Sequence, residues 1–197
     1  MPLLRADGLW SVLRDLPDDY VAPPWETLLL DARVLLESER LPEVGPALVL
    51  AASAIETRID DALRVLAERH GGTVVALWSW LSKRDPWWQE PSIVEKLSVV
   101  LGALTGRSLK DDNDLWEAFQ NLREARNRYV HEGVAQIGGQ PVTSDQASNL
   151  VAKTRLILDW LEDGLPEEAR RPRYERLHTF QIDRALTAPE PGARDQS

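Results

Sequence analysis

The sequence predicts an all-α fold, a helical bundle with helical extensions at both ends. Apolar residues recur with a period near 3.6 along most of the chain, and no run shows the alternating pattern of a β-strand. Its 197 residues suffice for one domain with a substantial core. The predicted divisions are an N-terminal extension at 1–23, the helical domain at 24–165, a C-terminal helix at 166–186 and a flexible tail at 187–197.

Two helices are predicted in the first third of the chain. Pro24 opens a helix that reaches about Arg40. Pro46 lies in the first turn of the strongest helix, which ends at Gly71-Gly72. On a helical wheel the apolar residues of this second helix fall within about 60° of Leu48. The two apolar stripes are Leu28, Ala32, Leu35 and Leu36 in the first helix, and Leu48, Ala51, Ala52, Ile55, Ile59, Ala62, Leu63 and Leu66 in the second.

Cap and stop residues predict the remaining helices. Ser92 and Glu95 have the spacing of a capping box, in which each side chain binds the backbone N–H of the other residue. Thr143 and Gln146 repeat that spacing. The predicted helices are a Trp-rich one at 73–83, then 93–105, 114–132, 143–163 and a last one opened by Pro166, with Gly106, Gly133 and Gly164 as stops and a turn at 138–141.

Composition and charge exclude several function classes. The net charge of −9 argues against broad, nonspecific nucleic-acid binding. Residues 1–70 hold most of the acid excess, with 7 basic and 13 acidic side chains, so a local basic cluster can exist later in the chain. The absence of cysteine excludes disulfides and thiol catalysis. Three widely spaced histidines predict no metal site, and no cofactor is expected.

The chain also lacks the pattern of a membrane protein. No apolar run approaches the roughly 20 residues that span a bilayer, and Arg5 and Asp7 interrupt any signal-like stretch at the N-terminus. We therefore expect a cytoplasmic protein without membrane contact.

The segment 122–133 breaks the apolar pattern of its helix. Leu115, Phe119, Leu122 and Tyr129 define a core face, yet Arg126 falls in the middle of that arc. A buried arginine needs a partner, or its face must line a cleft or interface. Glu56, at the edge of the 47–69 apolar stripe, is the first candidate partner, and Asp60 is the second. Asn127 and His131 lie one turn apart on a shared side of the helix.

The pattern Arg126-Asn127-x-x-x-His131 near the end of a long helix resembles the signature of the HEPN superfamily. The upstream helix with Ala51-Ala52 and Glu56 also resembles the first long helix of those domains. The resemblance covers about residues 24–165 and implies a HEPN-like helical bundle. It further implies a metal-independent endoribonuclease of a toxin–antitoxin or phage-defence system. Such an enzyme works as a homodimer with Arg126 and His131 of both chains in one cleft.

The residue types suit the chemistry that the resemblance implies. The ribose 2′-hydroxyl attacks the adjacent phosphate and leaves a 2′,3′-cyclic phosphate and a 5′-hydroxyl. His131 can move protons near neutral pH, Arg126 offers a planar fork to the phosphate, and Asn127 can orient either one. The supporting residues are Arg123, Arg128, Glu56 and Tyr129. The implied partners are RNA, such as tRNA or mRNA, and an antitoxin or defence-system protein.

Other interpretations remain open. The chain could be a non-catalytic HEPN dimerisation or adaptor module that binds a protein partner or a nucleotide. Residues 28–62 superficially resemble one tetratricopeptide repeat, although no second copy follows at the repeat period. In a plain bundle, Arg126 would pair with a carboxylate and His131 would decorate a helix end. Core packing is the expected role of the eight tryptophans, with Trp87-Trp88 and the arginine cluster at 170–176 as secondary candidates for partner or RNA contacts.

Overall fold

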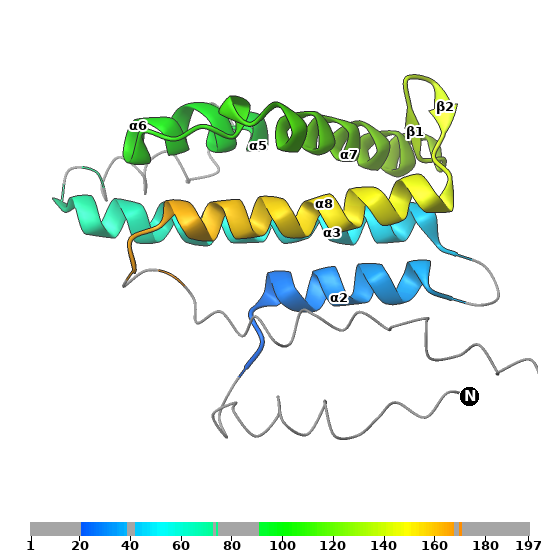
Figure 1. Cartoon of the computed structure of the whole chain (residues 1–197), viewed down its shortest axis with the longest axis horizontal. Coiled ribbons are helices and arrows are strands. Elements are labelled where there is room, and N and C mark those ends of the chain that lie inside the picture. The colour runs from blue at the N-terminus through cyan, green and yellow to red at the C-terminus, as the bar shows by residue number, and fades with distance from the viewer. Residues whose placement is uncertain (1–20, 39–41, 73, 75–90, 168–169, 171–197) are drawn as a thin grey trace, which may run out of the picture. The chain divides into compact units, whose positions relative to one another are not determined.

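The computed structural model describes residues 21–38, 42–72, 74, 91–167 and 170. Residues Ala22–Arg171 form one compact unit. Within it, α3 (Val44–His70) and α8 (Ser144–Gly164) run side by side in the centre (Figure 1). The shorter α2 (Pro24–Leu36) packs on one side of this pair, and α7 (Asn113–Glu132) packs on the other. The described part of the chain is therefore an all-α bundle, as the helical periodicity predicts.

Helix α3 confirms the apolar stripe of the second predicted helix, whose eight members are all buried. Its C-terminal cap is Gly71, where φ is 82°. The predicted face of α2 needs correction, because the buried residues are Trp25, Leu29 and Ala32, whereas Leu28, Leu35 and Leu36 are only partly buried. This helix also ends at Leu36 rather than near Arg40. The buried face instead follows Trp25, Leu29 and Ala32, whose spacing of four and three residues places them on one side of the helix.

A continuous helical segment runs from α5 (Ile93–Glu95) through the π-helical turn η1 (Lys96–Val100) into α6 (Leu101–Thr105). The predicted capping box is present, since Ser92 Oγ accepts from Glu95 N and the Glu95 carboxylate accepts from Ser92 N at 2.7 Å. Gly106 ends the segment with φ at 74°. The short 3₁₀ turn η2 (Leu109–Asp111) then leads to α7. The predicted helix at 93–105 is thus confirmed, with a π-helical turn that its sequence does not signal.

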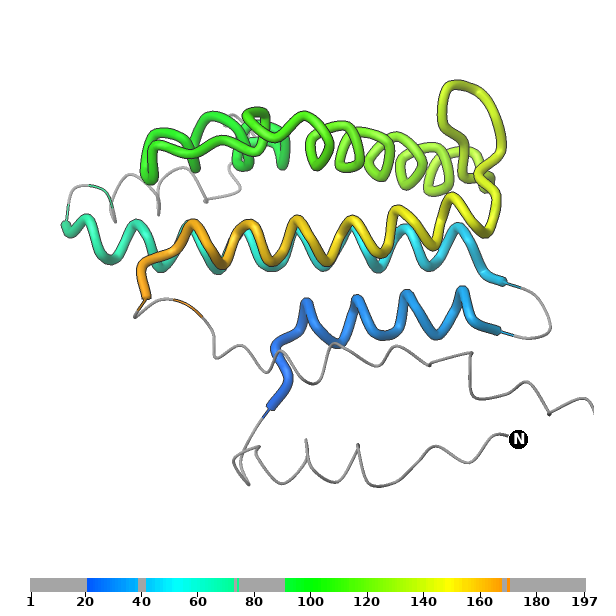
Figure 2. Tube along the Cα trace, viewed as in Figure 1, coloured from blue at the N-terminus to red at the C-terminus, as the bar shows by residue number. Residues whose placement is uncertain are grey.

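Helices α7 and α8 are joined by a hairpin that the strand analysis missed. Strands β1 (Gln136–Ile137) and β2 (Gln140–Pro141) pair antiparallel around Gly138 and Gly139, which both have positive φ. The turn itself was predicted, but two-residue strands are too short to show alternation. Figure 2 shows the trace rising through this hairpin between the end of α7 and the start of α8. Thr143 and Gln146 form the second predicted capping box at the start of α8.

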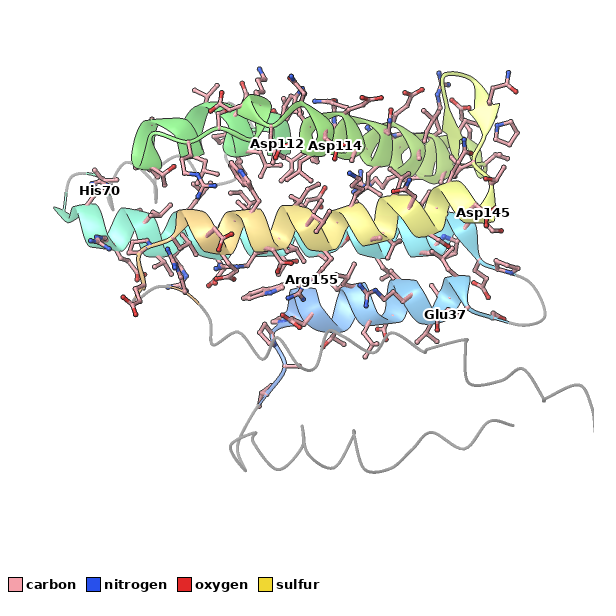
Figure 3. The ribbon with its side chains drawn as sticks, in the orientation of Figure 1. Glu37, His70, Asp112, Asp114, Asp145 and Arg155 are labelled. Atoms are coloured by element: carbon pink, nitrogen blue, oxygen red, sulfur yellow. The ribbon has the colours of Figure 1, made fainter. Side chains whose placement is uncertain are left out.

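One apolar cluster joins the long helices. Arg155 of α8 reaches across to Glu26 of α2, with Nη1 and Oε1 3.4 Å apart, and Figure 3 shows Arg155 between these helices. Because α2 and α3 both pack on α8 of the same bundle, the segment 28–62 is one helix pair of that bundle rather than a unit stacked on a second pair. No helix in the described ranges is long and apolar enough to cross a membrane.

The described tryptophans pack as predicted. Trp25 is buried, while Trp116 and Trp160 are partly buried against the core. Each has a cation over its ring, namely Arg58 over Trp25, Lys110 over Trp116 and Arg107 over Trp160, with distances to the ring centre of 4.8, 5.3 and 4.8 Å. The remaining tryptophans, the predicted Trp-rich helix, most of the N-terminal extension and the chain beyond Arg170 lie outside the described residues.

Candidate functional site

Arg126 lies on the C-terminal half of α7 and faces α3. Its Nη1 donates to Asn127 Oδ1 at 3.1 Å, and its Nη2 lies 3.9 Å from Glu56 Oε1. Its Nε is buried and has no hydrogen-bond partner among the residues that the structure describes. The predicted partner Glu56 is therefore in place, but the contact is long and leaves one donor of the guanidinium unsatisfied. A buried donor without a partner is uncommon and costs free energy, so it requires an explanation.

A pocket of about 150 Å³ opens beside this guanidinium. Its apolar wall includes Ala52 of α3, Ile93 of α5 and Leu122 of α7, and its polar groups are Glu56, Arg123, Arg126 and Asn127. The other predicted partner, Asp60, instead accepts a 2.7 Å hydrogen bond from the buried Lys96 of η1. The guanidinium groups of Arg123 and Arg126 and the amide of Asn127 can therefore donate hydrogen bonds to an anion in this pocket. Among the lining residues, the carboxylate of Glu56 repels such an anion.

His131 stands apart from this pocket. It is exposed in the last turn of α7 and does not line the pocket of Arg126. Five residues of helix separate it from Arg126, which corresponds to roughly 7.5 Å along the axis and about 140° around it. Within the described residues, no hydrogen bond or ion pair is formed by its ring. Arg126 and Asn127 are thus brought together, and His131 is presented to solvent on the same side as Asn127.

The predicted supporting residues divide into three groups. Arg123 lines the pocket and hydrogen-bonds Gln120 Oε1 at 3.3 Å. Arg128 forms an exposed ion pair with Glu132, away from that pocket. Tyr129 is partly buried, and its ring lies against Gly45 of α3. Tyr129 therefore fixes the end of α7 on α3, and it does not line the pocket.

Sequence reasoning missed the most buried charge in the described chain. Arg58 of α3 is 1% exposed, and its Nε donates to Glu162 Oε1 of α8 at 2.7 Å. Its Nη1 donates to Asp61 at 2.9 Å. A signal was available, because Arg58 lies about 80° from Leu48 on the wheel, as close to the apolar stripe as Glu56 on the opposite edge. This ion pair ties α3 to α8, and among the described residues the Nη2 of Arg58 is, like Arg126 Nε, buried without a hydrogen-bond partner.

Comparison of the chain with protein-family models, with curated proteins and with solved structures found no match.

Proposed function

We propose that this protein is a HEPN-type, metal-independent endoribonuclease whose site is completed when two copies meet at the C-terminal halves of their α7 helices. The observation that carries the proposal is the guanidinium of Arg126. It has a buried, unsatisfied Nε beside a pocket that also holds Arg123 and Asn127. A phosphate is the anion that best matches a planar fork with adjacent amide donors.

The reaction needs one phosphate binder and one proton carrier at each site. One His131 removes the proton of the ribose 2′-hydroxyl, and the 2′ oxygen forms a bond to phosphorus. The bond between phosphorus and the 5′ oxygen breaks, that oxygen takes a proton from water, and the imidazolium returns its proton to the solvent. Arg126 stabilises the charge that develops on the phosphate oxygens. The products are a 2′,3′-cyclic phosphate and a 5′-hydroxyl, so protons and electrons balance without a co-reactant.

A second copy supplies what one chain lacks. Because Arg126 and His131 point about 140° apart on one helix, a phosphate held at the Arg126 pocket is not faced by the imidazole of the same chain. Two α7 helices related by a twofold axis place the His131 of one copy opposite the Arg126 of the other. The exposed Val130 and Val134 flank His131, with 52% and 47% exposure, and contact with a second copy would cover them.

The first test is cleavage of mixed single-stranded RNA and tRNA by the wild type, Arg126→Ala and His131→Ala in EDTA. We expect cyclic phosphate ends from the wild type only, with at least a hundredfold loss in each variant. His70→Ala is the matched control, because His70 is an exposed histidine at the opposite end of the bundle from the start of α8 (Figure 3). Full activity in His131→Ala would exclude this site.

The alternative is a non-catalytic HEPN dimerisation or adaptor module. The contact of Glu56 with Arg126 favours it, because a carboxylate next to the guanidinium offsets part of the charge that a phosphate needs. The net charge of −9 acts in the same direction. A folded dimer that never cuts RNA would support this alternative.

A further inference from the structure

A separate pocket of about 290 Å³ lies between α7, β1 and α8. Its floor is apolar, because Ala118 and Leu150 are buried there. Its rim carries the amides of Asn121, Gln146 and Asn149, and we refer to it as the amide pocket. An apolar floor with a few converging polar groups is the usual form of a small-ligand site.

The amides of this pocket are available to a ligand. Within the described residues, no hydrogen bond is formed by the side chain of Asn121 or Asn149. Gln146 uses its Oε1 to accept from Thr143 N at 3.0 Å in the capping box, which leaves its NH₂ group unused. The pocket therefore offers acceptors and donors in the same small volume, as the edge of a nucleobase requires.

Carboxylates make the amide pocket selective. Glu117 is exposed and lines it, and Asp114 lines it while paired with Lys153. A carboxylate accepts a hydrogen bond from an exocyclic amino group, and Asn or Gln side chains pair with the edge of adenine. Uracil has no exocyclic amino group to donate. Lys153 also lines the pocket, but the two carboxylates outweigh its single positive charge and disfavour a phosphate, so the pocket suits a base rather than the backbone of a strand.

A third pocket shares lining residues with both the amide pocket and the pocket of Arg126. It has a volume of about 330 Å³ and lies over the exposed side of α7. It shares Asn121 with the amide pocket and shares Arg123 and Asn127 with the pocket of Arg126. From Asn121 to Asn127 is about 9 Å along the helix axis. A strand can therefore run from the phosphate site across Arg123 into the amide pocket.

We propose that the amide pocket binds an adenine or cytosine base of the same single-stranded RNA whose phosphate lies at Arg126, and thereby sets sequence preference. This inference rests on the proposed function for the identity of the strand. Single-stranded RNA is the form in which a base can leave its stack and present its edge to side chains.

The test is binding of fluorescent ribo-decamers of A, C or U to the full-length His131→Ala protein, followed by fluorescence anisotropy at fixed salt. We expect the A and C decamers to bind about tenfold more tightly than U, the discrimination of one good base-edge contact. Asn149→Ala, added to His131→Ala, should bring A and C to the level of U and leave U unchanged. Asn149 is exposed on α8, and alanine favours a helix, so this variant should fold.

Ser148→Ala is the matched control, an exposed neighbour on α8 that does not line the pocket. Equal affinity for the three decamers, or an equal loss of all three in Asn149→Ala, would overturn the inference. Binding of free AMP or CMP without binding of decamers would assign the pocket to a nucleotide and also overturn it. Cleavage by the wild type without base preference would overturn this inference but support the proposed nuclease function. Base preference in binding without cleavage would support base binding in the amide pocket but not the nuclease function.

Discussion

Gly45, in the first turn of α3, lies directly against the ring of Tyr129 on α7, so the ring fills the space that a side chain at residue 45 would occupy. A glycine early in a helix is otherwise unfavourable. Here it permits the close approach of two helices. Because His131 follows Tyr129 by two residues, this contact also fixes where the last turn of α7 presents its imidazole.

Gly45→Ala should therefore destabilise the protein by about 1–3 kcal/mol, because the methyl group displaces the ring of Tyr129. Gly102→Ala is the matched control, since among the described residues the nearest atoms to a Cβ there are Arg107 O at 3.8 Å and Ser108 Cβ at 4.0 Å. It should stabilise α6 by about 0.5–1 kcal/mol. Urea unfolding followed by circular dichroism measures both. Equal effects of the two substitutions would contradict the packing at Gly45.

Removing Arg58 should cost far more than removing an exposed arginine. Arg58→Met breaks the buried 2.7 Å ion pair with Glu162 of α8 as well as the pair with Asp61, and should destabilise the protein by about 3–5 kcal/mol. Arg64 is itself exposed and pairs with Asp61 and Glu68 within α3, so Arg64→Ala should cost no more than about 1 kcal/mol. The measurement is the free energy of unfolding in urea. A loss at Arg58 as small as that at Arg64 would show that the α3–α8 ion pair is not needed.

The capping box at Ser92 predicts a pH dependence. Hydrogen bonds from the backbone N–H and then the hydroxyl of Ser92 hold the pKa of the Glu95 carboxyl below its ordinary value of 4.5. Because the pKa of this carboxyl is lower in the folded than in the unfolded chain, its ionised form stabilises the fold at any pH above the unfolded-state pKa. This contribution is lost as the pH falls through the folded-state pKa. Glu95→Gln should therefore be less stable than the wild type at pH 7, with the difference shrinking below about pH 4.5.

Thermal unfolding at several pH values measures this difference. Glu117→Gln, an exposed glutamate on α7 outside any capping box, is the control and should show no such convergence with the wild type. A wild type and Glu95→Gln that stay equally far apart from pH 7 to pH 3 would contradict the role of the Glu95 charge. Ser92→Ala should separately cost about 1 kcal/mol through loss of the cap.

Local signals predicted the helices well because they act within a few residues. The two predicted capping boxes and the αL glycines at Gly106 and Gly133 depend on contacts inside one helix, the stripe of α3 shows as a periodicity within one helix, and all are present. The hairpin after α7 was missed because its strands are two residues long. What holds it is nonlocal, since Glu124 Oε1 of α7 accepts from Gly138 N at 2.9 Å across fourteen residues.

The candidate site was predictable only where one helix contained it. Arg126 interrupts an apolar arc, and that interruption pointed correctly to Glu56 as its neighbour. Lys96 could not be foreseen as the partner of Asp60, because that contact depends on how η1 packs against α3. The amide pocket is likewise assembled from α7, β1 and α8. The periodicity of one segment cannot predict a pocket whose walls come from three separate segments.

Glu56→Gln tests whether Glu56 restrains the phosphate site. Glutamine keeps the length of the side chain and removes the negative charge near Arg126. In the His131→Ala background, we expect RNA to bind about fivefold more tightly, as expected when one like charge near a phosphate is removed in water. Fluorescence anisotropy at several salt concentrations measures this gain, which should shrink as salt rises. Weaker binding in Glu56→Gln would mean that the carboxylate is required to hold Arg126 in position.

Mixing two inactive variants tests whether the site is shared between copies. Arg126→Ala and His131→Ala each remove one half of the proposed site, and each alone should be inactive. In a mixed dimer, the intact Arg126 of one chain meets the intact His131 of the other. Random exchange makes about half of the dimers mixed, each with one of two Arg–His pairs, so about a quarter of wild-type cleavage should return. The mixture must first be unfolded and refolded together, and each variant refolded alone is the control. If the mixture stays as inactive as its components while size measurements show dimers, both groups must act from the same chain, and the arrangement across the α7 helices would be wrong.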